Sequence, residues 1–276
     1  MKTGSWIVII LLLAGPLGAS SPDSTPVLLD QVPINQLRNV LKGYNGDWRH
    51  DSDSFKGVPE PVINTIPADA PRLALPDPGE RPLPVDFHDL LANRRSVRDF
   101  SSIPITAHDL ALLLWSAQGV SARMEGKSFR TAPSAGGRYP LETHVVARRV
   151  EGVSPGLYRY DPETHSLVGP RSPAGGDAGL VAACYGSEPV ANAAAVVVWS
   201  AIPRRTEWKY TYTSHRMIAM EAGHACQNAS LAAVALGLGA CPLLSYHQIA
   251  LDRWLGLDGD NEFAMYVLAL GKPATK

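Results

Sequence analysis

Residues 215–236 read His-Arg-Met-Ile-Ala-Met-Glu-Ala-Gly-His-Ala-Cys-Gln-Asn-Ala-Ser-Leu-Ala-Ala-Val-Ala-Leu, a small-residue, apolar stretch that predicts one long helix. Polar residues interrupt it at Glu221, His224, Gln227 and Asn228. They argue against a transmembrane helix, which needs about 20 predominantly apolar residues. A helix with so many small residues on its surface is typical of one that runs through a domain or along a dimer interface. We therefore expect this helix to organise the fold.

Strand-like segments lie on both sides of this helix, each rich in Val, Leu or Tyr and bounded by Gly, Pro or Asp. They cover residues 143–150, 156–160 and 193–201 before the helix and 263–270 after it. A second helix is expected to begin at Thr106, with Asp109 three residues on, and to run to Gln118. Strands and helices alternate without the regular order of a parallel sheet. The predicted fold class is therefore α+β, with a mixed sheet flanked by helices.

The first 20 residues predict an export signal. Lys2 precedes the apolar run Trp6–Ala14, which is too short to span a bilayer, and small residues suited to cleavage follow it. An uncleaved membrane anchor is the alternative. Residues 21–85 are rich in Pro and Asp and predict an extended arm, so we expect residues 86–276 to form the main domain.

Composition and missing motifs argue against several classes of protein. A net charge of −1 and a pI near 6.7 argue against a nucleic-acid-binding role. The three cysteines are too few and too scattered for a disulfide framework or a zinc site, and Cys226 and Cys241 are expected to be small buried residues. The chain has no G-x-x-x-x-G-K-S/T phosphate loop, no G-x-S-x-G hydrolase motif and no complete dinucleotide fingerprint.

Three arginines and a serine fall within five residues at Arg94-Arg95-Ser96-Val97-Arg98. They follow the amphipathic run Phe87–Ala92, which predicts that the cluster lies at the end of a helix. Guanidinium groups bind phosphate oxygens bidentately, so the cluster suits a phosphate monoester. The alternative is a solvated basic turn, and the segments that follow in the chain favour the first interpretation.

Two further segments carry candidate chemistry. Residues 133–140, Pro-Ser-Ala-Gly-Gly-Arg-Tyr-Pro, place small residues between two prolines, which lets a planar ligand approach the backbone. Lys209 and Tyr210 set an ammonium beside a phenol at the expected start of the long helix, and such groups can move protons near neutral pH when their pKa is shifted. The alternatives are a tight loop without a ligand, and a solvent-facing Lys beside a packed Tyr.

Glu221 and His224 are spaced i, i+3 on the long helix, as in some metal sites. A metal ion would need more ligands, and His215 and His247 are only loosely placed to supply them. We therefore expect no metal site. The pair is interpreted as a buried hydrogen bond between the two side chains.

Taken together, the order and spacing of these segments resemble the FMN-dependent nitroreductase family. Within it they are most similar to the SagB/ThcOx-type branch, which includes the azoline dehydrogenases of peptide natural-product pathways. The resemblance runs from about Phe87 to Pro273. Its motifs are Arg94–Phe100, Leu113–Gly119, Arg130–Glu142, Gly156–Tyr160, Lys209–Tyr210, Glu221–Asn228 and Gly237–Pro242.

The resemblance implies an α+β homodimer that binds FMN at the subunit interface, with the long helix at that interface. It implies that the phosphate and ribityl end of FMN is held by Arg94, Arg95, Ser96 and Arg98, with Lys272 as a late phosphate contact. It also implies a loop from the partner subunit that flanks the isoalloxazine ring, formed by Pro133, Ser134, Ala135 and Gly136. Leu243 and Leu244 would lie near the central ring of the flavin.

In the azoline dehydrogenases a Lys-Tyr pair is implicated in proton removal, and the corresponding catalytic residues here are Lys209 and Tyr210. Two departures leave the substrate class open, because Thr211 and Leu244 stand where relatives usually have Gly. The export signal is a third departure, since azoline dehydrogenases work in the cytosol.

Export bears on the reaction, because no NAD(P)H pool is maintained outside the cytosol. We therefore expect an exported FMN-dependent dehydrogenase or oxidase that takes a hydride from a small-molecule or peptide-like substrate. One alternative is an NAD(P)H-dependent nitro- or ene-reductase, and another is a binding module that has lost its flavin. Neither a nucleic-acid partner nor stable membrane insertion is expected.

Overall fold

The computed structural model describes residues 49–80, 83, 85–173 and 175–274. Its centre is a seven-stranded sheet with the order β1-β8-β7-β5-β9-β11-β10, in which neighbouring strands are antiparallel. These strands are β1 (Arg72–Ala74), β5 (Leu141–Ala147), β7 (Gly156–Asp161), β8 (Ser166–Arg171), β9 (Ala195–Ala201), β10 (Gly239–Leu243) and β11 (Phe263–Gly271). Two small pairs lie outside it: β2 (Ile105–Thr106) runs parallel to β6 (Val150–Glu151), and β3 (Val120–Met124) forms a hairpin with β4 (Lys127–Arg130).

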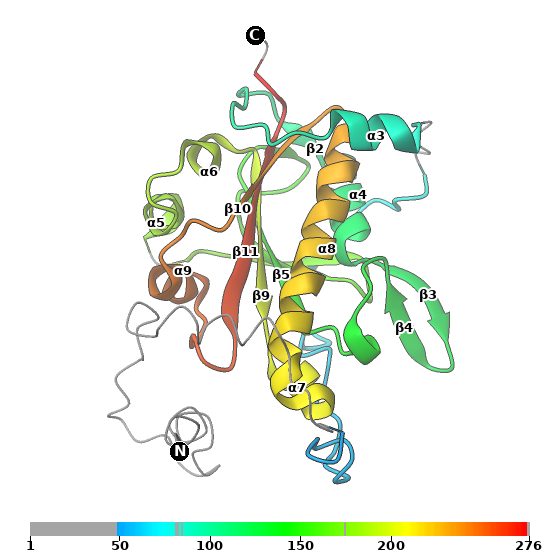
Figure 1. The fold of residues 1–276 in the computed structure, drawn as a ribbon. Helices are drawn as coiled ribbons and strands as arrows, with labels where there is room; N and C mark the ends of the chain where they lie inside the picture. Colours follow the sequence, from blue (N-terminus) through cyan, green and yellow to red (C-terminus); the bar gives the residue numbers. More distant parts are fainter. Residues whose placement is uncertain (1–48, 81–82, 84, 174, 275–276) are drawn as a thin grey trace, which may run out of the picture. The chain divides into compact units, whose positions relative to one another are not determined.

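Helices lie on both faces of the sheet (Figure 1). One face carries α3 (Phe87–Asn93), α4 (Ala107–Gln118) and α8 (Ser214–Ala235), and the other carries α5 (Gly176–Ala183), α6 (Glu188–Asn192) and α9 (Gln248–Leu255). Val145 and Val197 pack in the core beneath α4 and α8, whereas Val146 and Val196 pack in the core beneath α5 and α9. This alternation is the period of two that a strand imposes. The predicted α+β fold class is confirmed.

The predicted helices at Phe87, at Thr106 and along residues 215–236 are all present. The long helix α8 has 22 residues and begins and ends one residue earlier than predicted. The start of α4 is fixed by a capping box, in which Thr106 Oγ1 accepts from the Asp109 amide and the Asp109 carboxylate accepts from the Thr106 amide. Such a box stabilises a helix start by about 1 kcal/mol. Small residues of α8 such as Ala222 and Ala225 are buried in the core that also contains the leucines of α4.

The four predicted strands are present with shifted ends, but β8 and β10 were not predicted. Both contain residues that disfavour strands: Gly169 and Pro170 in β8, and Pro242 in β10. Proline is tolerated in β10 because this strand lies at the edge of the sheet, where one side of the backbone has no ladder partner.

The sequence suggested that Lys209 and Tyr210 lie at the start of the long helix, and the structure shows that they do not. They end a separate short helix, α7 (Arg204–Tyr210), which the 3-10 turn η3 (Thr211–Thr213) joins to α8. Thr211 interrupts the helical path because its φ is 48°, in the left-handed region.

Residues 49–66 form turns and irregular chain that contacts α7. The Ser54 amide donates to the Trp208 carbonyl at 2.8 Å, and Trp208 Nε1 donates to the Val58 carbonyl at 2.7 Å. The boundary between arm and domain near residue 85 stays a prediction, and the predicted export signal lies outside the described residues. In the described ranges, no helix is long and apolar enough to cross a membrane.

Candidate functional site

The arginine cluster lies where α3 ends and β10 begins. The Arg94 amide caps α3 by donating to the Leu90 carbonyl at 3.0 Å, which confirms the predicted helix end. Ser96 then pairs with Ala240 in a parallel bridge, and the Val97 amide donates to the Ala240 carbonyl at 2.9 Å. The cluster is therefore held against the edge strand of the sheet.

Gly239 permits this close approach. A β-carbon at that position would lie 2.7 Å from Val97 Cγ1, well inside van der Waals contact. The end of β11 also reaches this part of the molecule, because the Ser101 amide donates to the Lys272 carbonyl at 2.8 Å. The predicted phosphate-binding residues thus gather in one region. Lys272 belongs to it because its carbonyl binds Ser101, which is three positions after Arg98 in the chain.

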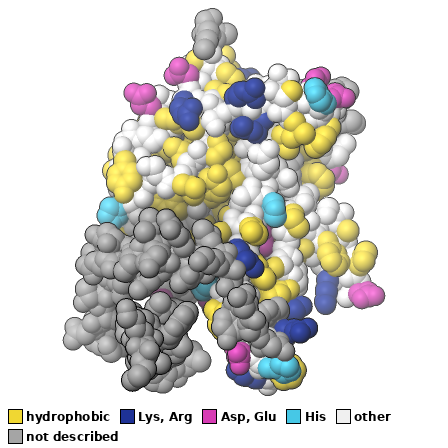
Figure 2. Space-filling view, in the orientation of Figure 1, with side chains coloured by type: hydrophobic (Ala, Val, Ile, Leu, Met, Phe, Trp, Pro, Cys, Tyr) yellow, Lys and Arg dark blue, Asp and Glu magenta, His cyan; other side chains and the backbone are white. Residues whose placement is uncertain are grey.

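The arginines of the cluster are not equally available. Arg95 donates to the carbonyls of Ala92 and Arg94 at 2.9 and 2.8 Å, so its guanidinium closes the end of α3. Arg98 is exposed and Arg94 is half-buried, and neither has a carboxylate within ion-pair distance among the described residues. Figure 2 shows Lys and Arg side chains gathered near the end of the molecule where α3 and β10 lie.

The positive charge of these arginines affects the pKa values of two buried thiols. Burial raises the pKa of Cys226 to about 11 and the Arg94 guanidinium opposes the shift, while burial also raises the pKa of Cys241 and Arg98 opposes it. Both cysteines are neutral and buried at neutral pH, as predicted.

Leu243 and Leu244 lie at the end of β10. Leu243 pairs with Val267 and is half-buried, whereas the Leu244 side chain is 67% exposed. Leu244 directly follows β10, the strand that pairs with Ser96 of the arginine cluster, so the same edge of the sheet offers an apolar side chain and guanidinium groups. Such a surface suits a planar aromatic ligand that carries a phosphate.

The loop Pro133–Gly137 lies beside α7. Its conformation is fixed by the Tyr139 amide, which donates to Ser134 Oγ at 2.8 Å, and by the 3-10 turn η2 (Ala135–Gly137). Gly136 and Gly137 have φ values of 62° and 64°, which favour glycine.

Lys209 and Tyr210 meet this loop at Gly136. A β-carbon built there would lie 2.7 Å from the Tyr210 hydroxyl oxygen and 3.2 Å from Lys209 Nζ. Within the pair, Lys209 Nζ is 5.7 Å from the centroid of the Tyr210 ring. The structure thus brings together two predicted site segments that are more than 70 residues apart in the sequence.

Glu221 of α8 is buried close to the same loop. Its side chain is in the hydrophobic interior, and Oε1 has no hydrogen-bond partner among the described residues. Burial raises the pKa of Glu221 to about 7, while the Ser134 hydroxyl and the guanidinium groups of Arg130 and Arg205 oppose the rise. His224 is exposed on the helix, so the predicted buried hydrogen bond between Glu221 and His224 is wrong.

The two groups of candidate residues lie toward opposite ends of α8 (Figure 1). At about 1.5 Å per residue, its 22 residues span roughly 33 Å. The arginine cluster lies near the C-terminal half of the helix, which carries Cys226, and α7 precedes its first residue.

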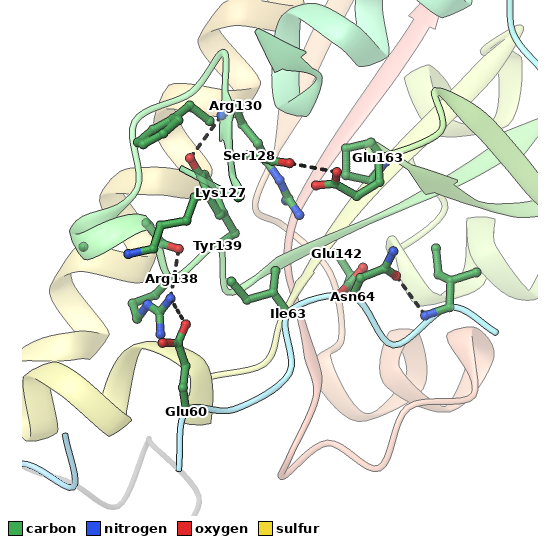
Figure 3. Close-up of a pocket in the computed structure, with 16 residues that line it drawn as sticks. Glu60, Ile63, Asn64, Lys127, Ser128, Arg130, Arg138, Tyr139, Glu142 and Glu163 are labelled. Carbon is green, nitrogen blue, oxygen red and sulfur yellow. Dashed lines mark hydrogen bonds and ion pairs between the residues drawn. The ribbon is translucent and has the colours of Figure 1, made fainter. Parts of the chain in front are cut away.

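A cavity of about 500 Å³ lies between the arm, the β3–β4 hairpin and η2. Figure 3 shows the residues that line it, including Glu60, Ile63 and Asn64 of the arm and Arg130 of β4. Sequence reasoning did not find this cavity or Arg130 as a functional residue. The hairpin itself had a signal, because Glu125-Gly126 forms a two-residue turn with both φ values positive, at 50° and 73°.

One group of possible metal ligands occurs in the described ranges, at Asp86, His88 and Asp89. All three are exposed, and Asp86 Oδ1 accepts from the amides of His88 and Asp89 as the N-cap of α3. The Asp86 carboxylate thus has a structural role at the start of a helix.

Comparison with known proteins agrees with this geometry. The sequence pattern described as "Nitroreductase family" matches residues 91–272. The nitroreductase-family protein MJ1384 of Methanocaldococcus jannaschii is 34% identical over 204 residues, which cover 74% of this chain and 98% of that protein.

Solved structures share the fold. A nitroreductase-family structure from Ralstonia eutropha JMP134 has a TM-score of 0.60 at 25% identity and covers 79% of this chain and 95% of its own. One from Anabaena variabilis has a TM-score of 0.60 at 23% identity and covers 75% of this chain, which spans 42% of the length of that protein. A chain of the E. coli microcin synthetase McbBCD complex has a TM-score of 0.56 at 21% identity, over 81% of this chain and 88% of its own. By its matched pattern and its relative in Methanocaldococcus, this chain belongs to the nitroreductase family, whose members are typically flavin-dependent oxidoreductases.

Proposed function

We propose that the protein is an exported FMN-dependent oxidoreductase of the SagB/ThcOx type that takes a hydride from a small-molecule or peptide-like substrate. The observation that carries this proposal is the meeting of Lys209 and Tyr210 with the backbone of Gly136. A proton-transferring pair is thereby set against the loop that the family resemblance assigns to the flavin.

The residues present fit FMN. Arg94 and Arg98 offer guanidinium groups without a carboxylate partner in the described ranges, which suits a phosphate. The exposed side chain of Leu244 offers an apolar contact for a ring, and Gly136 offers backbone that a ring can approach closely. Bound FMN would supply the two-electron acceptor.

Lys209 and Tyr210 would move the proton. When a substrate loses a hydride from carbon, the adjacent N–H or C–H must lose a proton for the new double bond to form. The deprotonated Tyr210 oxygen is the group that would accept this proton and become the neutral phenol, and the Lys209 ammonium beside it would stabilise the anion before the transfer.

A homodimer is part of the proposal. The arginine cluster and the Lys209–Tyr210 pair lie toward opposite ends of a helix roughly 33 Å long, so a second copy could set its loop beside the first copy's arginines. The face of α8 that carries Met220, Gly223 and His224 is exposed and available for such a contact.

The visible absorption spectrum of the purified chain, before and after added FMN, tests the cofactor. Flavin bands with tight retention would support the proposal, whereas a flat spectrum without uptake would favour a binding module that has lost its flavin. Rapid bleaching of the bands by NAD(P)H would favour a nitro- or ene-reductase instead.

Two variants test the proton-transfer assignment. Lys209→Ala and Tyr210→Phe should each retain flavin and lose turnover, so full activity in both would remove the pair from the mechanism. Export is tested separately, by the mass and location of the mature chain in the producing cell.

A further inference from the structure

The cavity beneath the arm is lined by both charged and apolar side chains. Arg130, Arg138 and Lys127 contribute cations, and Ile63, Ile66 and Phe129 contribute apolar surface. Its volume, about 500 Å³, falls within the range of small-molecule sites. The cavity is therefore large enough for an organic ligand with one polar end.

The three carboxylates that line it already have arginine partners. Glu60 pairs with Arg138, and Glu163 pairs with Arg123 at 3.2 Å and accepts from Ser128 Oγ at 2.8 Å. Glu142 is buried between two further arginines that lie 2.6 Å from its oxygens, namely Arg159 and Arg205. The negative charge of the lining is thus compensated within the protein.

Arg130 differs from the arginines that pair with these carboxylates. One of its five N–H donors is bound to Gln118 Oε1 at 2.8 Å, and its guanidinium stacks 4.6 Å from the centroid of the Tyr139 ring. In the described part of the chain it has no ion pair with a carboxylate. Figure 3 shows its side chain directed into the cavity.

Burial works against the charge of this arginine. Burial lowers the pKa of Arg130, and the carboxylates of Glu142 and Glu221 at longer range oppose that effect. A guanidinium in such surroundings gains more from a direct anionic partner than one in water does, because the local dielectric is lower.

We propose that this cavity binds the free carboxylate of the substrate, with Arg130 as its anchor and the arm as one wall. The inference rests on the proposed function, since it takes the ligand to be the molecule that Lys209 and Tyr210 act upon. The link is the loop Gly136–Gly137, which lines the cavity and also meets both of those side chains.

The lining favours a monoanion with amide and apolar groups, such as the C-terminal residue of a short peptide. The half-buried guanidinium of Arg130 has the fork geometry that binds one carboxylate through two parallel hydrogen bonds. Asn64 of the arm can bond an amide, and Ile63 and Phe129 can contact an apolar side chain.

The arm is held firmly enough to serve as a wall. Arg159 Nη2 donates to Thr65 Oγ1 at 2.9 Å, and Arg205 Nε donates to the Val62 carbonyl at 3.3 Å. Together with the Glu60–Arg138 ion pair, these bonds fix the arm on both sides of Ile63.

Calorimetric titration of the purified chain with a matched pair of probes tests the proposal. The probes are N-acetylglycyl-L-phenylalanine and its carboxamide, which differ in charge and hardly in shape. The acid should bind at least about tenfold more tightly, as expected for a charge-assisted hydrogen bond. Arg130→Gln should abolish the preference, and Arg253→Gln, which removes an exposed arginine of α9, should retain it.

A second variant guards against a folding defect in Arg130→Gln. Ile63→Trp fills the cavity from the arm without changing any charge, and it should weaken binding of both probes. Equal binding of acid and amide, a preference that survives Arg130→Gln, or unchanged binding in Ile63→Trp would overturn the proposal. Competition by inorganic phosphate with an affinity equal to that of the acid would overturn the assignment to a carboxylate.

The titration reads binding and not turnover, so the two proposals fail separately. A chain without flavin that still prefers the acid would contradict the proposed function alone. A chain that turns over substrate and shows no preference between the probes would contradict this inference alone.

Discussion

Replacement of Glu221 by Gln tests the most unusual electrostatic feature of the structure. Glu221 is 3% exposed and its pKa is raised by burial to about 7, from an ordinary value of 4.5. In the unfolded chain the same carboxyl ionises near its ordinary value. The folded protein therefore binds one more proton than the unfolded chain between these two pH values.

The sign of the effect follows from this difference. As pH rises from about 4.5 to 7, the unfolded state gains relative to the folded one, so Glu221 costs stability above pH 7. A shift of about 2.5 pKa units corresponds to about 3 kcal/mol at 1.36 kcal/mol per unit, as an upper limit. Gln is isosteric with the protonated carboxyl and does not ionise, so it avoids this cost.

Urea unfolding followed by tryptophan fluorescence at pH 5 and pH 8 measures the effect. The stability of Glu221→Gln minus that of the parent should become more favourable by about 2–3 kcal/mol between the two pH values. The titration of the histidines cancels in this difference because both proteins contain them. Glu151→Gln is the control, since Glu151 is exposed on β6. A difference that is the same at both pH values would refute the buried, high-pKa carboxyl.

Three other predictions concern the arginine cluster, the glycine loop and the arm. Arg94→Ala should weaken FMN binding by about 1.5–3 kcal/mol through loss of a charge-assisted contact, and Arg95→Ala by less, because Arg95 is bound to backbone carbonyls; fluorescence titration with FMN ranks the two. Gly136→Ala should abolish turnover through collision with the tyrosine hydroxyl, whereas Gly137→Ala carries the same backbone strain, has its nearest neighbour at 4.0 Å and should retain more activity. Equal activities of the Gly136→Ala and Gly137→Ala variants would show that backbone strain, and not the collision with Tyr210, causes the loss of turnover. Trp208→Phe removes the bond to the arm and should destabilise its docking by about 1 kcal/mol, seen as faster proteolysis within residues 49–66; an unchanged cleavage rate would contradict that contact.

The fold was predictable where its signals are local. The capping box of α4 joins residues three apart, and the small-residue pattern of α8 lies within a single segment. The short helix α7 has no such signal. It is held by Arg205, which donates to the Tyr139 carbonyl at 3.1 Å and pairs with Glu142 at 2.6 Å, more than 60 residues away in sequence. No pattern within a short window could have shown that α7 is separate from α8.

The candidate site likewise has some features that neighbouring residues reveal and others that depend on contacts between distant segments. The chemistry of the arginine cluster could be read from neighbouring residues, and the structure adds that Arg95 is committed to the end of α3. The meeting of Tyr210 with Gly136 could not be derived from spacing, because it depends on where α7 docks. Arg130 was missed because its importance lies in the lack of a carboxylate partner among the described residues, and sequence does not show which carboxylates pair with the neighbouring arginines.

The arm and the Lys209–Tyr210 pair depend on the same buried arginine. Arg205 binds Glu142 and the Tyr139 carbonyl inside the domain, and through Nε it also binds the Val62 carbonyl of the arm. Because Arg205 belongs to α7, a change that loosens its guanidinium would weaken one bond that holds the arm and one that holds the helix ending at Tyr210. Without Arg205, Glu142 would keep only Arg159 as an ion-pair partner in a buried site, where an ion pair matters more than at the surface. Docking of the arm and placement of Lys209 and Tyr210 therefore depend on the same ion-pair network. Truncation of the arm is expected to lower the turnover rate.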